Sequence, residues 1–261
     1  MRQLRLTIAY DGTEYVGWQV QTNGISVQER LETAWRRITG ESRRIVASGR
    51  TDSGVHALGQ VCGLETESQL DDLTLVRALN AILPDDVSVL DLVTIEGGFD
   101  PIRDAVRKTY RYQIQSGRRH DVFDRRFWWF VPPELDVASM KRAAEQIIGR
   151  HDFECFQTAG SERLTTVRTI SDLNIFERVN DPYQWITIEV TADGFLYNMV
   201  RCIAGTLALV GLHKRPVEWV REVINSRDRM LAGPTAPSHA LILVSVHYEL
   251  EHLPKSSTVI Q

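Results

Sequence analysis

The apolar residues of this chain recur with two spacings, one typical of strands and one typical of helices. Near the amino terminus Leu4, Leu6, Ile8 and Tyr10 alternate with polar or small residues, which predicts a strand with one buried face. Similar runs predict strands over residues 44–48, 60–65, 87–93, 108–115, 127–131, 167–176, 185–190 and 241–249. Helical spacing predicts helices over residues 26–40, 72–83, 137–148 and 197–210, and one that begins near Pro216. Helices and strands mix without regular alternation, which favours an α+β fold.

Two of these helices begin with recognisable capping residues. Ser26, followed three residues later by Glu29, has the pattern of a capping box, and Asp136 directly precedes the helix over 137–148. The segment 197–210 is apolar on nearly every side, which predicts a buried helix. Trp18 and Trp35 are expected in the core.

Length and composition narrow the class of protein. The chain has 261 residues, 43% of them hydrophobic and 25% charged, which leaves room for one large globular domain or two smaller ones. We predict an amino-terminal half over 1–102, a carboxy-terminal half over 103–250 and a loose tail over 251–261. No apolar run is long enough to span a bilayer, and the first residues lack the apolar core of a signal peptide. We therefore expect a cytoplasmic protein that does not bind membranes.

The cysteines and the short motifs exclude several kinds of chemistry. Cys62, Cys155 and Cys202 are few, odd in number and far apart, which argues against disulfides and against a cysteine metal site. The sequence has no phosphate loop ending in Gly-Lys-Ser/Thr, no Gly-x-Gly-x-x-Gly turn, no Gly-x-Ser-x-Gly elbow and no zinc spacing of His or Cys. An enzyme without metal or cofactor, built around a single carboxylate, is still open.

One loop is a natural place for such a carboxylate. The run from Ala47 to His56 reads Ala-Ser-Gly-Arg-Thr-Asp-Ser-Gly-Val-His and lies between two apolar runs, as expected of a strand, a tight loop and a strand. Its glycines allow a sharp turn and the close approach of a ligand, and Arg50 beside Asp52 favours the charged carboxylate. Asp, Ser and Gly are also ordinary turn residues, and taken alone the loop favours a simple surface turn.

Residues 103–126 form a basic stretch, although the whole chain has a net charge of −4. The stretch holds eight Arg or Lys residues against three Asp residues, a net charge of +5, with aromatic residues interleaved. Arginine combined with aromatic side chains suits phosphate contact and base stacking. A strand edge protected by charge explains the same residues equally well.

Five stretches of the chain form an ordered set of motifs. They are Tyr-Asp-Gly-Thr-Glu-Tyr-Val-Gly-Trp-Gln at 10–19 with Ser-Val-Gln-Glu at 26–29, Gly-Arg-Thr-Asp-Ser-Gly-Val-His at 49–56 with Gly-Gln-Val at 59–61, Asn-Ala-Ile-Leu-Pro at 80–84, Lys-Thr-Tyr-Arg-Tyr at 108–112, and Phe-Leu-Tyr-Asn-Met-Val-Arg at 195–201 with Gly-Thr-Leu at 205–207. Together they resemble the tRNA pseudouridine synthase A family, and the likeness runs in order from about residue 4 to residue 249.

The resemblance implies a fold, an activity and a set of site residues. The fold would be the α+β pseudouridine synthase fold, with a long mixed, mostly antiparallel sheet flanked by helices and an active-site cleft between two halves. Such enzymes isomerise uridine to pseudouridine at positions 38, 39 and 40 of the tRNA anticodon stem-loop, as homodimers and without cofactor or metal. By position, Asp52 is expected as the catalytic nucleophile and Tyr110 as the residue that stacks on the target base. Arg50 and Arg201 are expected as active-site cations, and Leu241 as an apolar contact near the base.

The chain departs from the family pattern at two places. Ile102 stands where family members often have an arginine, with Arg103 next to it. In a strand, a shift by one residue turns the side chain to the other face, so Arg103 is not an obvious replacement. Ala240 stands where a glycine usually precedes the equivalent of Leu241, which would tighten the backbone near the base.

A nucleophilic carboxylate has to stay charged in a site that partly excludes water. Burial alone raises its pKa, whereas a nearby guanidinium lowers it. Arg201 lies on the predicted apolar helix, where an unpaired cation is costly to bury, so we expect it to pair with Asp52 and to keep it anionic. The carboxylate could form a transient covalent bond or remove a ribose proton, and the sequence leaves both routes open.

Two other functions fit parts of the sequence. One is a catalytically silent RNA-binding protein on the same scaffold. The other is an enzyme that uses Cys62 for conjugate addition to the pyrimidine. The second is disfavoured, because Cys62 lies in an apolar strand without an obvious activating base.

Overall fold

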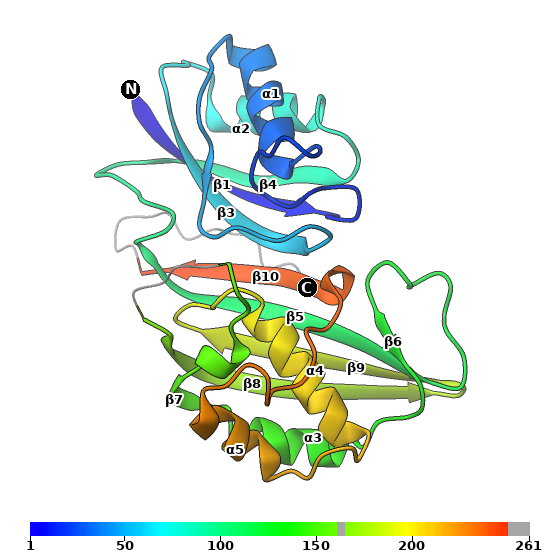
Figure 1. Cartoon of the computed structure of the whole chain (residues 1–261). Helices are drawn as coiled ribbons and strands as arrows, with labels where there is room; N and C mark the ends of the chain where they lie inside the picture. The colour runs from blue at the N-terminus through cyan, green and yellow to red at the C-terminus, as the bar shows by residue number, and fades with distance from the viewer. Residues whose placement is uncertain (161–164, 250–261) are drawn as a thin grey trace.

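The computed structural model describes residues 1–160 and 165–249, and its strands form one ten-stranded sheet (Figure 1). The strands are β1 (Arg2–Tyr10), β2 (Val46–Ala47), β3 (His56–Thr66), β4 (Val87–Ile95), β5 (Ala105–Gly117), β6 (Trp129–Val131), β7 (Gly149–Asp152), β8 (Val167–Asn180), β9 (Tyr183–Ala192) and β10 (Leu241–Tyr248). The helices are α1 (Val27–Thr39), α2 (Asp72–Asn80), α3 (Val137–Ala144), α4 (Met199–Gly211) and α5 (Trp219–Ser226), with the 3-10 turns η1 (Glu154–Phe156) and η2 (Ser238–Ala240).

The order across the sheet is β4-β1-β3-β10-β5-β9-β8-β7, with β2 beside β3 and β6 beside β5. Most neighbouring strands are antiparallel, whereas β10 pairs with β3 and β6 pairs with β5 in parallel. The long mixed, mostly antiparallel sheet implied by the resemblance is therefore present.

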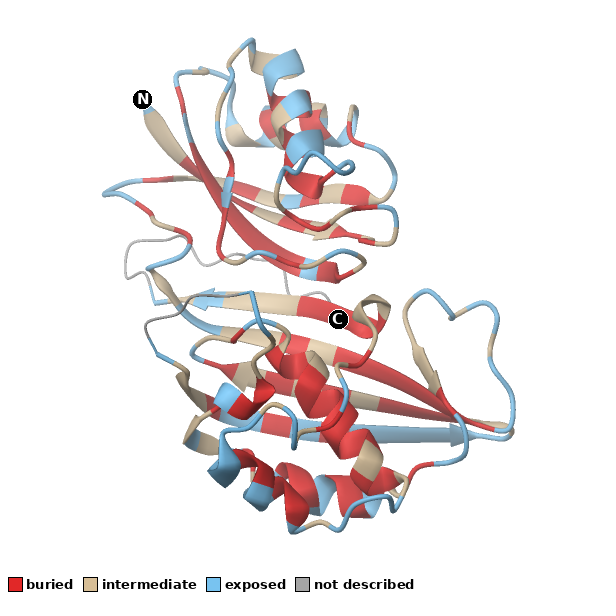
Figure 2. Cartoon of the chain, viewed as in Figure 1, coloured by how far each residue is buried: buried red, intermediate tan, exposed pale blue. Residues whose placement is uncertain are grey.

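The helices cover the sheet in two groups. In Figure 1, α1 and α2 lie beside β1, β3 and β4, whereas α3, α4 and α5 lie over the strands at the other end. Figure 2 shows α4 almost entirely buried, which confirms the prediction from its apolar sequence. Trp18 and Trp35 belong to the core, as expected. No helix in the described part of the chain is long and apolar enough to cross a bilayer.

The amino-terminal strands β4, β1 and β3 join the rest of the sheet where β3 pairs with β10. This parallel pairing is short, with His56 opposite Ile242 and Ala57 opposite Leu243. It brings the loop before β3, which carries Asp52, next to the carboxy-terminal strands. The predicted boundary near residue 102 lies in the segment that links β4 to β5. The division into halves stays a prediction, and the tail over 251–261 lies outside the described residues.

The predicted caps are confirmed, whereas several element ends differ. The Ser26 hydroxyl accepts a hydrogen bond from the backbone N–H of Glu29 at 3.2 Å, and Asp136 accepts one from the N–H of Ser139 at 3.0 Å. The helices predicted over 72–83 and 137–148 end earlier, at 80 and 144, and β3 begins four residues earlier than predicted. Strand β7, Gly-Arg-His-Asp, has no apolar alternation and forms because it pairs with the edge of β8.

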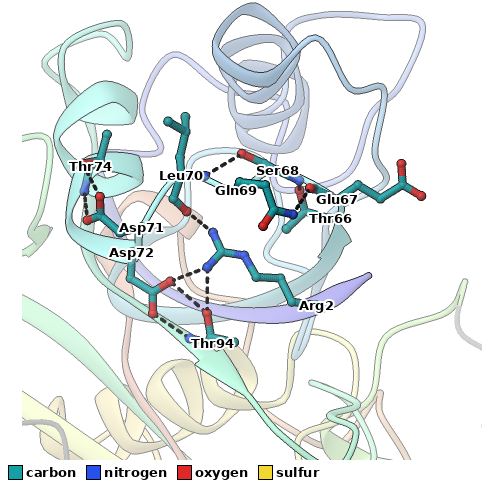
Figure 3. A network of polar contacts seen from close by, with 10 residues as sticks. All are labelled: Arg2, Thr66, Glu67, Ser68, Gln69, Leu70, Asp71, Asp72, Thr74 and Thr94. Carbon is teal, nitrogen blue, oxygen red and sulfur yellow. Dashed lines mark hydrogen bonds and ion pairs between the residues drawn. The ribbon is translucent and has the colours of Figure 1, made fainter.

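A polar network fixes the amino-terminal end of the sheet (Figure 3). Arg2 of β1 donates to the carboxylate of Asp72 at 3.3 Å, and that carboxylate also accepts bonds from the backbone N–H and the hydroxyl of Thr94, at 2.8 and 2.9 Å. One side chain of α2 therefore connects β1 and β4.

We expect Asp72→Ala to lower the free energy of unfolding by about 1–3 kcal/mol, because Arg2 and Thr94 lose a charged partner. Urea unfolding followed by circular dichroism measures this change. Asp72→Asn, which keeps an acceptor oxygen, should lose less. An alanine variant as stable as the wild type would show that the network contributes nothing.

Candidate active site

The loop that carries Asp52 is held by backbone contacts from the segment after β1. The carbonyl oxygen of Thr51 accepts a hydrogen bond from the N–H of Trp18 at 3.0 Å, and Gly17 forms an isolated bridge with Asp52. Gly17 has φ of 106°, and a Cβ there would lie 2.5 Å from the Thr51 oxygen. Only glycine therefore allows this close packing. The hydroxyl of Thr51 also bonds to that of Tyr10 at 2.7 Å.

A buried glutamine holds the start of the same loop. The amide oxygen of Gln60 accepts a hydrogen bond from the Ser48 hydroxyl at 2.8 Å, and its amide nitrogen donates to the carbonyl of Gly49 at 2.9 Å. From β5, the Nζ of Lys108 donates to the carbonyl of Ser48 at 2.6 Å. Side chains from β3 and β5, the two strands that flank β10, thus fix the loop. Sequence analysis assigned no role to Gln60 or Lys108, although both lie in the quoted motifs.

Asp52 is half-buried and faces one cation. Its side chain is 35% exposed, and its Oδ2 lies 3.9 Å from Nη1 of Arg201, so the expected pair is present. This distance is too long for a hydrogen bond, which leaves the carboxylate oxygens free to meet a substrate. Burial raises the pKa of Asp52, and the charge of Arg201 offsets this only in part. The charge of Arg201 therefore acts in the expected direction and favours the ionised carboxylate, although desolvation outweighs it in setting the pKa.

Arg201 is oriented by neighbours that sequence analysis did not single out. It lies in the first turn of α4, where its Nε donates to the carbonyl of Ala236 at 2.7 Å and its Nη1 donates to Oδ1 of Asn198 at 2.6 Å. Asn198 precedes α4 with φ of 62°, and its amide nitrogen donates to the hydroxyl of Thr158 at 2.8 Å. An asparagine directly before an apolar helix was the available signal, because Asn tolerates this left-handed conformation.

Tyr110 lies in β5 close to Asp52. Burial raises its pKa most, and the charges of Tyr10 and Asp52 raise it further. Its ring meets that of Phe195 edge to face, with centroids 5.0 Å apart. The ring is only 9% exposed. The structure therefore brings Asp52, Arg201 and Tyr110 together.

Arg50 and Leu241 are not brought into this group by any recorded contact. Arg50 is exposed, and within the described residues its side chain forms neither an ion pair nor a hydrogen bond. It therefore does not support the charge of Asp52, contrary to the expectation from sequence. Leu241 is buried at the start of β10, opposite Tyr112. The roles expected for these two residues stay predictions.

The two departures from the family pattern have simple structural settings. Ile102 and Arg103 lie in a turn before β5, so the argument about strand faces does not apply. The Arg103 side chain is 81% exposed and pairs with Asp100 at 2.8 Å. Ala240 is fully buried in η2 and has no left-handed φ, so alanine fits the backbone there.

The described residues contain no candidate metal cluster, and the hollows found in the chain lie away from the expected site residues. Among residues 1–160 and 165–249, no group of three or more His, Cys, Asp or Glu side chains could hold a metal ion. Two hollows of about 330 and 500 Å³ lie elsewhere, and none of the five expected site residues lines either one. The cleft and the cofactor-free reaction stay predictions.

Cys62 is a poor candidate for the reacting group. It is fully buried in β3, and burial raises the pKa of its thiol. A thiol that is seldom ionised is a weak nucleophile. We expect Cys62→Ser and Cys62→Ala to keep a kcat close to that of the wild type, measured on tRNA. Loss of turnover in folded variants of both kinds would revive the cysteine mechanism.

Comparison with known proteins shows the family of this chain. The family model described as tRNA pseudouridine synthase matches residues 6–95 and 143–249. The tRNA pseudouridine synthase A of Thermoanaerobacter pseudethanolicus is 42% identical over 248 residues, which cover 95% of this chain and 100% of the relative. That of Myxococcus xanthus is 43% identical and covers 95% of this chain and 92% of the relative. With the mixed ten-stranded sheet, these matches confirm the expected fold class, and the chain belongs to the tRNA pseudouridine synthase A family.

Proposed function

We propose that this isomerase converts uridine to pseudouridine at positions 38, 39 and 40 of the tRNA anticodon stem-loop, with Asp52 as nucleophile and without a cofactor. The observation that carries the proposal is the half-buried Asp52 carboxylate, with Arg201 at 3.9 Å and no other hydrogen-bond or ion-pair partner within the described residues. Its loop sits within the motif that resembles the family most specifically.

The reaction rearranges bonds without redox change. The bond from C1′ to N1 breaks, the uracil turns, and a bond from C1′ to C5 forms, while N1 gains a proton and C5 loses one. An ionised carboxylate that attacks C1′ would divide this into two easier steps through a transient ester. Removal of a ribose proton by the same group is the alternative route, and both require Asp52 to be charged.

The surroundings of Asp52 suit a nucleophile. Burial raises the pKa of Asp52, because its anionic form is less well solvated than in water. The carboxylate is therefore more basic and more reactive than an exposed one. Arg201 prevents burial from neutralising it, and the hydrogen bonds to Ser48, Gly49 and Thr51 fix the loop before substrate arrives. Such preorganisation lowers the cost of reaching the reactive geometry.

We propose that Tyr110 contacts the extruded uracil. Flipping a stacked and paired base costs a few kcal/mol, and stacking on an aromatic ring can return about 1–3 kcal/mol. Because the Tyr110 ring is 9% exposed, a stacked base would need its neighbours to open slightly. Arg50 would then contact the RNA and Leu241 the base. We also expect the protein to act as a homodimer in the cytoplasm.

Tritium release from tRNA labelled at uridine C5 tests this function, because C5 must lose its proton when the new bond forms. We expect the wild type to release tritium from tRNA with uridine at positions 38, 39 or 40. Matched tRNA without uridine at these three positions should release none. Equal release from both tRNAs would place the target elsewhere, and no release from either would contradict the proposed reaction.

The rate should fall in acid over a higher pH range than for an ordinary aspartate. Since burial raises the pKa of Asp52, the carboxylate becomes protonated and unreactive at a higher pH. We expect the acid limb of kcat/KM to lie above pH about 4, the ordinary value for aspartate. A pH profile of tritium release measures it. A limb at or below the ordinary value would contradict the link between burial and reactivity.

A further inference from the structure

The loop between β5 and β6 exposes a phenylalanine at its tip. Phe123 is 90% exposed, more than any other large hydrophobic residue in the described chain, and its neighbour Val122 is also exposed. Figure 1 shows this loop beside β6 and projecting away from the sheet, and Figure 2 shows it largely exposed. A phenylalanine in this position gains almost nothing from burial within the chain, so its ring is available to a partner.

The loop is already ordered around this tip. The fully buried amide of Gln115 donates to the carbonyl of Arg119 at 2.8 Å and accepts from the N–H of Asp121 at 3.0 Å. The carboxylate of Asp121 accepts from the N–H of Phe123 at 2.9 Å, and Arg125 donates to the carbonyl of Val122 at 2.7 Å. A partner that contacts Phe123 would therefore pay little ordering entropy.

The far end of the loop lies against the elements of the candidate site. The Phe127 ring is 4.7 Å from the ring of His56, which begins β3 four residues after Asp52. The carbonyl of Trp128 accepts a hydrogen bond from Nε2 of His239, two residues before Leu241, at 3.3 Å. The tip is thus presented by a loop whose base borders the site.

The charge around the tip favours nucleic acid. Four exposed arginines flank Phe123 along the loop, and none forms an ion pair within the described residues: Arg118, Arg119, Arg125 and Arg126. One of the two acidic side chains in the loop, Asp121, already caps the N–H of Phe123. An aromatic side chain among exposed guanidinium groups can stack on a base while the arginines contact phosphates.

We propose that Phe123 is a stacking contact for tRNA, packing against an exposed base or base-pair end next to the target nucleotide, while the flanking arginines bind the backbone. The proposal rests on the proposed function. It assigns to Phe123 a role in RNA binding and none in the chemical step.

The test compares tRNA binding and turnover for Phe123→Ala, Phe123→Leu and Phe123→Tyr. Filter binding gives Kd, and tritium release gives KM and kcat. We expect Phe123→Ala to raise Kd and KM roughly 5- to 100-fold with kcat almost unchanged, since a stacked base contributes about this much. Phe123→Leu should lose nearly as much, and Phe123→Tyr should bind like the wild type. Phe176→Ala, which removes a half-exposed phenylalanine from β8, is the matched control and should leave Kd, KM and kcat unchanged.

The measurements distinguish a failure of the stacking contact from a failure of the proposed function. An unchanged Kd for Phe123→Ala overturns the stacking contact, and points instead to a protein partner at this tip. Wild-type affinity for Phe123→Leu also overturns it, because leucine is apolar but has no ring to stack. If the wild type releases no tritium, the proposed function fails, yet the Kd values still decide whether Phe123 contacts tRNA.

Discussion

Replacement of Asp52 by alanine is expected to abolish pseudouridine formation, with a loss of more than about 10³-fold in kcat, because no other carboxylate contacts Arg201 in the described chain. Tritium release measures the rate, and filter binding measures the affinity for tRNA. We expect the affinity to stay within a few-fold of the wild type, since the arginines that we propose to bind phosphates lie elsewhere in the chain.

The same variant distinguishes an enzyme from a catalytically silent RNA-binding protein. Asp52→Asn keeps the shape of the side chain and should lose turnover equally, whereas Asp91→Ala, in the edge strand β4, should lose none. Because folding raises the pKa of Asp52, holding this carboxylate ionised costs stability at neutral pH. Neither Asp52 variant should therefore lower the melting temperature. Turnover near the wild-type rate in either variant would refute the role of Asp52 as the nucleophile.

Replacement of Arg201 by methionine should produce the second large loss, about 10²- to 10³-fold in kcat/KM. Without its guanidinium, the pKa of Asp52 should rise further, because Arg201 is the charge that offsets burial. The acid limb of the pH profile should then shift upward, so part of the lost activity should return at higher pH. A purely structural role would lower activity equally at all pH values, and that result would contradict the electrostatic role.

Two further variants separate charge from orientation. Arg201→Lys keeps the charge but loses the paired bonds to Ala236 and Asn198, so it should show an intermediate loss. Asn198→Ala leaves the guanidinium in place without its second anchor, and we expect a smaller loss with a smaller shift of the acid limb. Thermal unfolding of each variant verifies that the fold is retained.

Most of the secondary structure could be read from the chain because it depends on local patterns. The alternation at Leu4 to Tyr10, the caps Ser26 and Asp136 and the apolar run of α4 each express a preference of neighbouring residues. Strand β7 was missed because its four residues carry no such pattern. It exists through pairing with β8, which is a contact between distant parts of the chain.

The sequence likewise predicted some features of the site and missed others. Motifs predicted the importance of the loop around Asp52 and of Tyr110. The cost of burying a lone arginine predicted the pairing of Arg201 with Asp52. Arg50 was expected to act on Asp52 because it is close in sequence, yet it is exposed and unpaired within the described residues. Closeness along the chain does not fix where a long side chain points, since both the backbone turn and the packing decide it.

The sequence by itself determined the family and the α+β class, and it singled out Asp52 as the proposed nucleophile, because each depends on short motifs in fixed order. Only the tertiary structure decided that Arg50 does not join Arg201 beside that carboxylate, that burial outweighs the charge of Arg201 in setting the pKa of Asp52, and that Phe123 projects into solvent. These depend on distances between residues far apart in the chain, and electrostatic and solvation energies follow such distances rather than positions in a sequence.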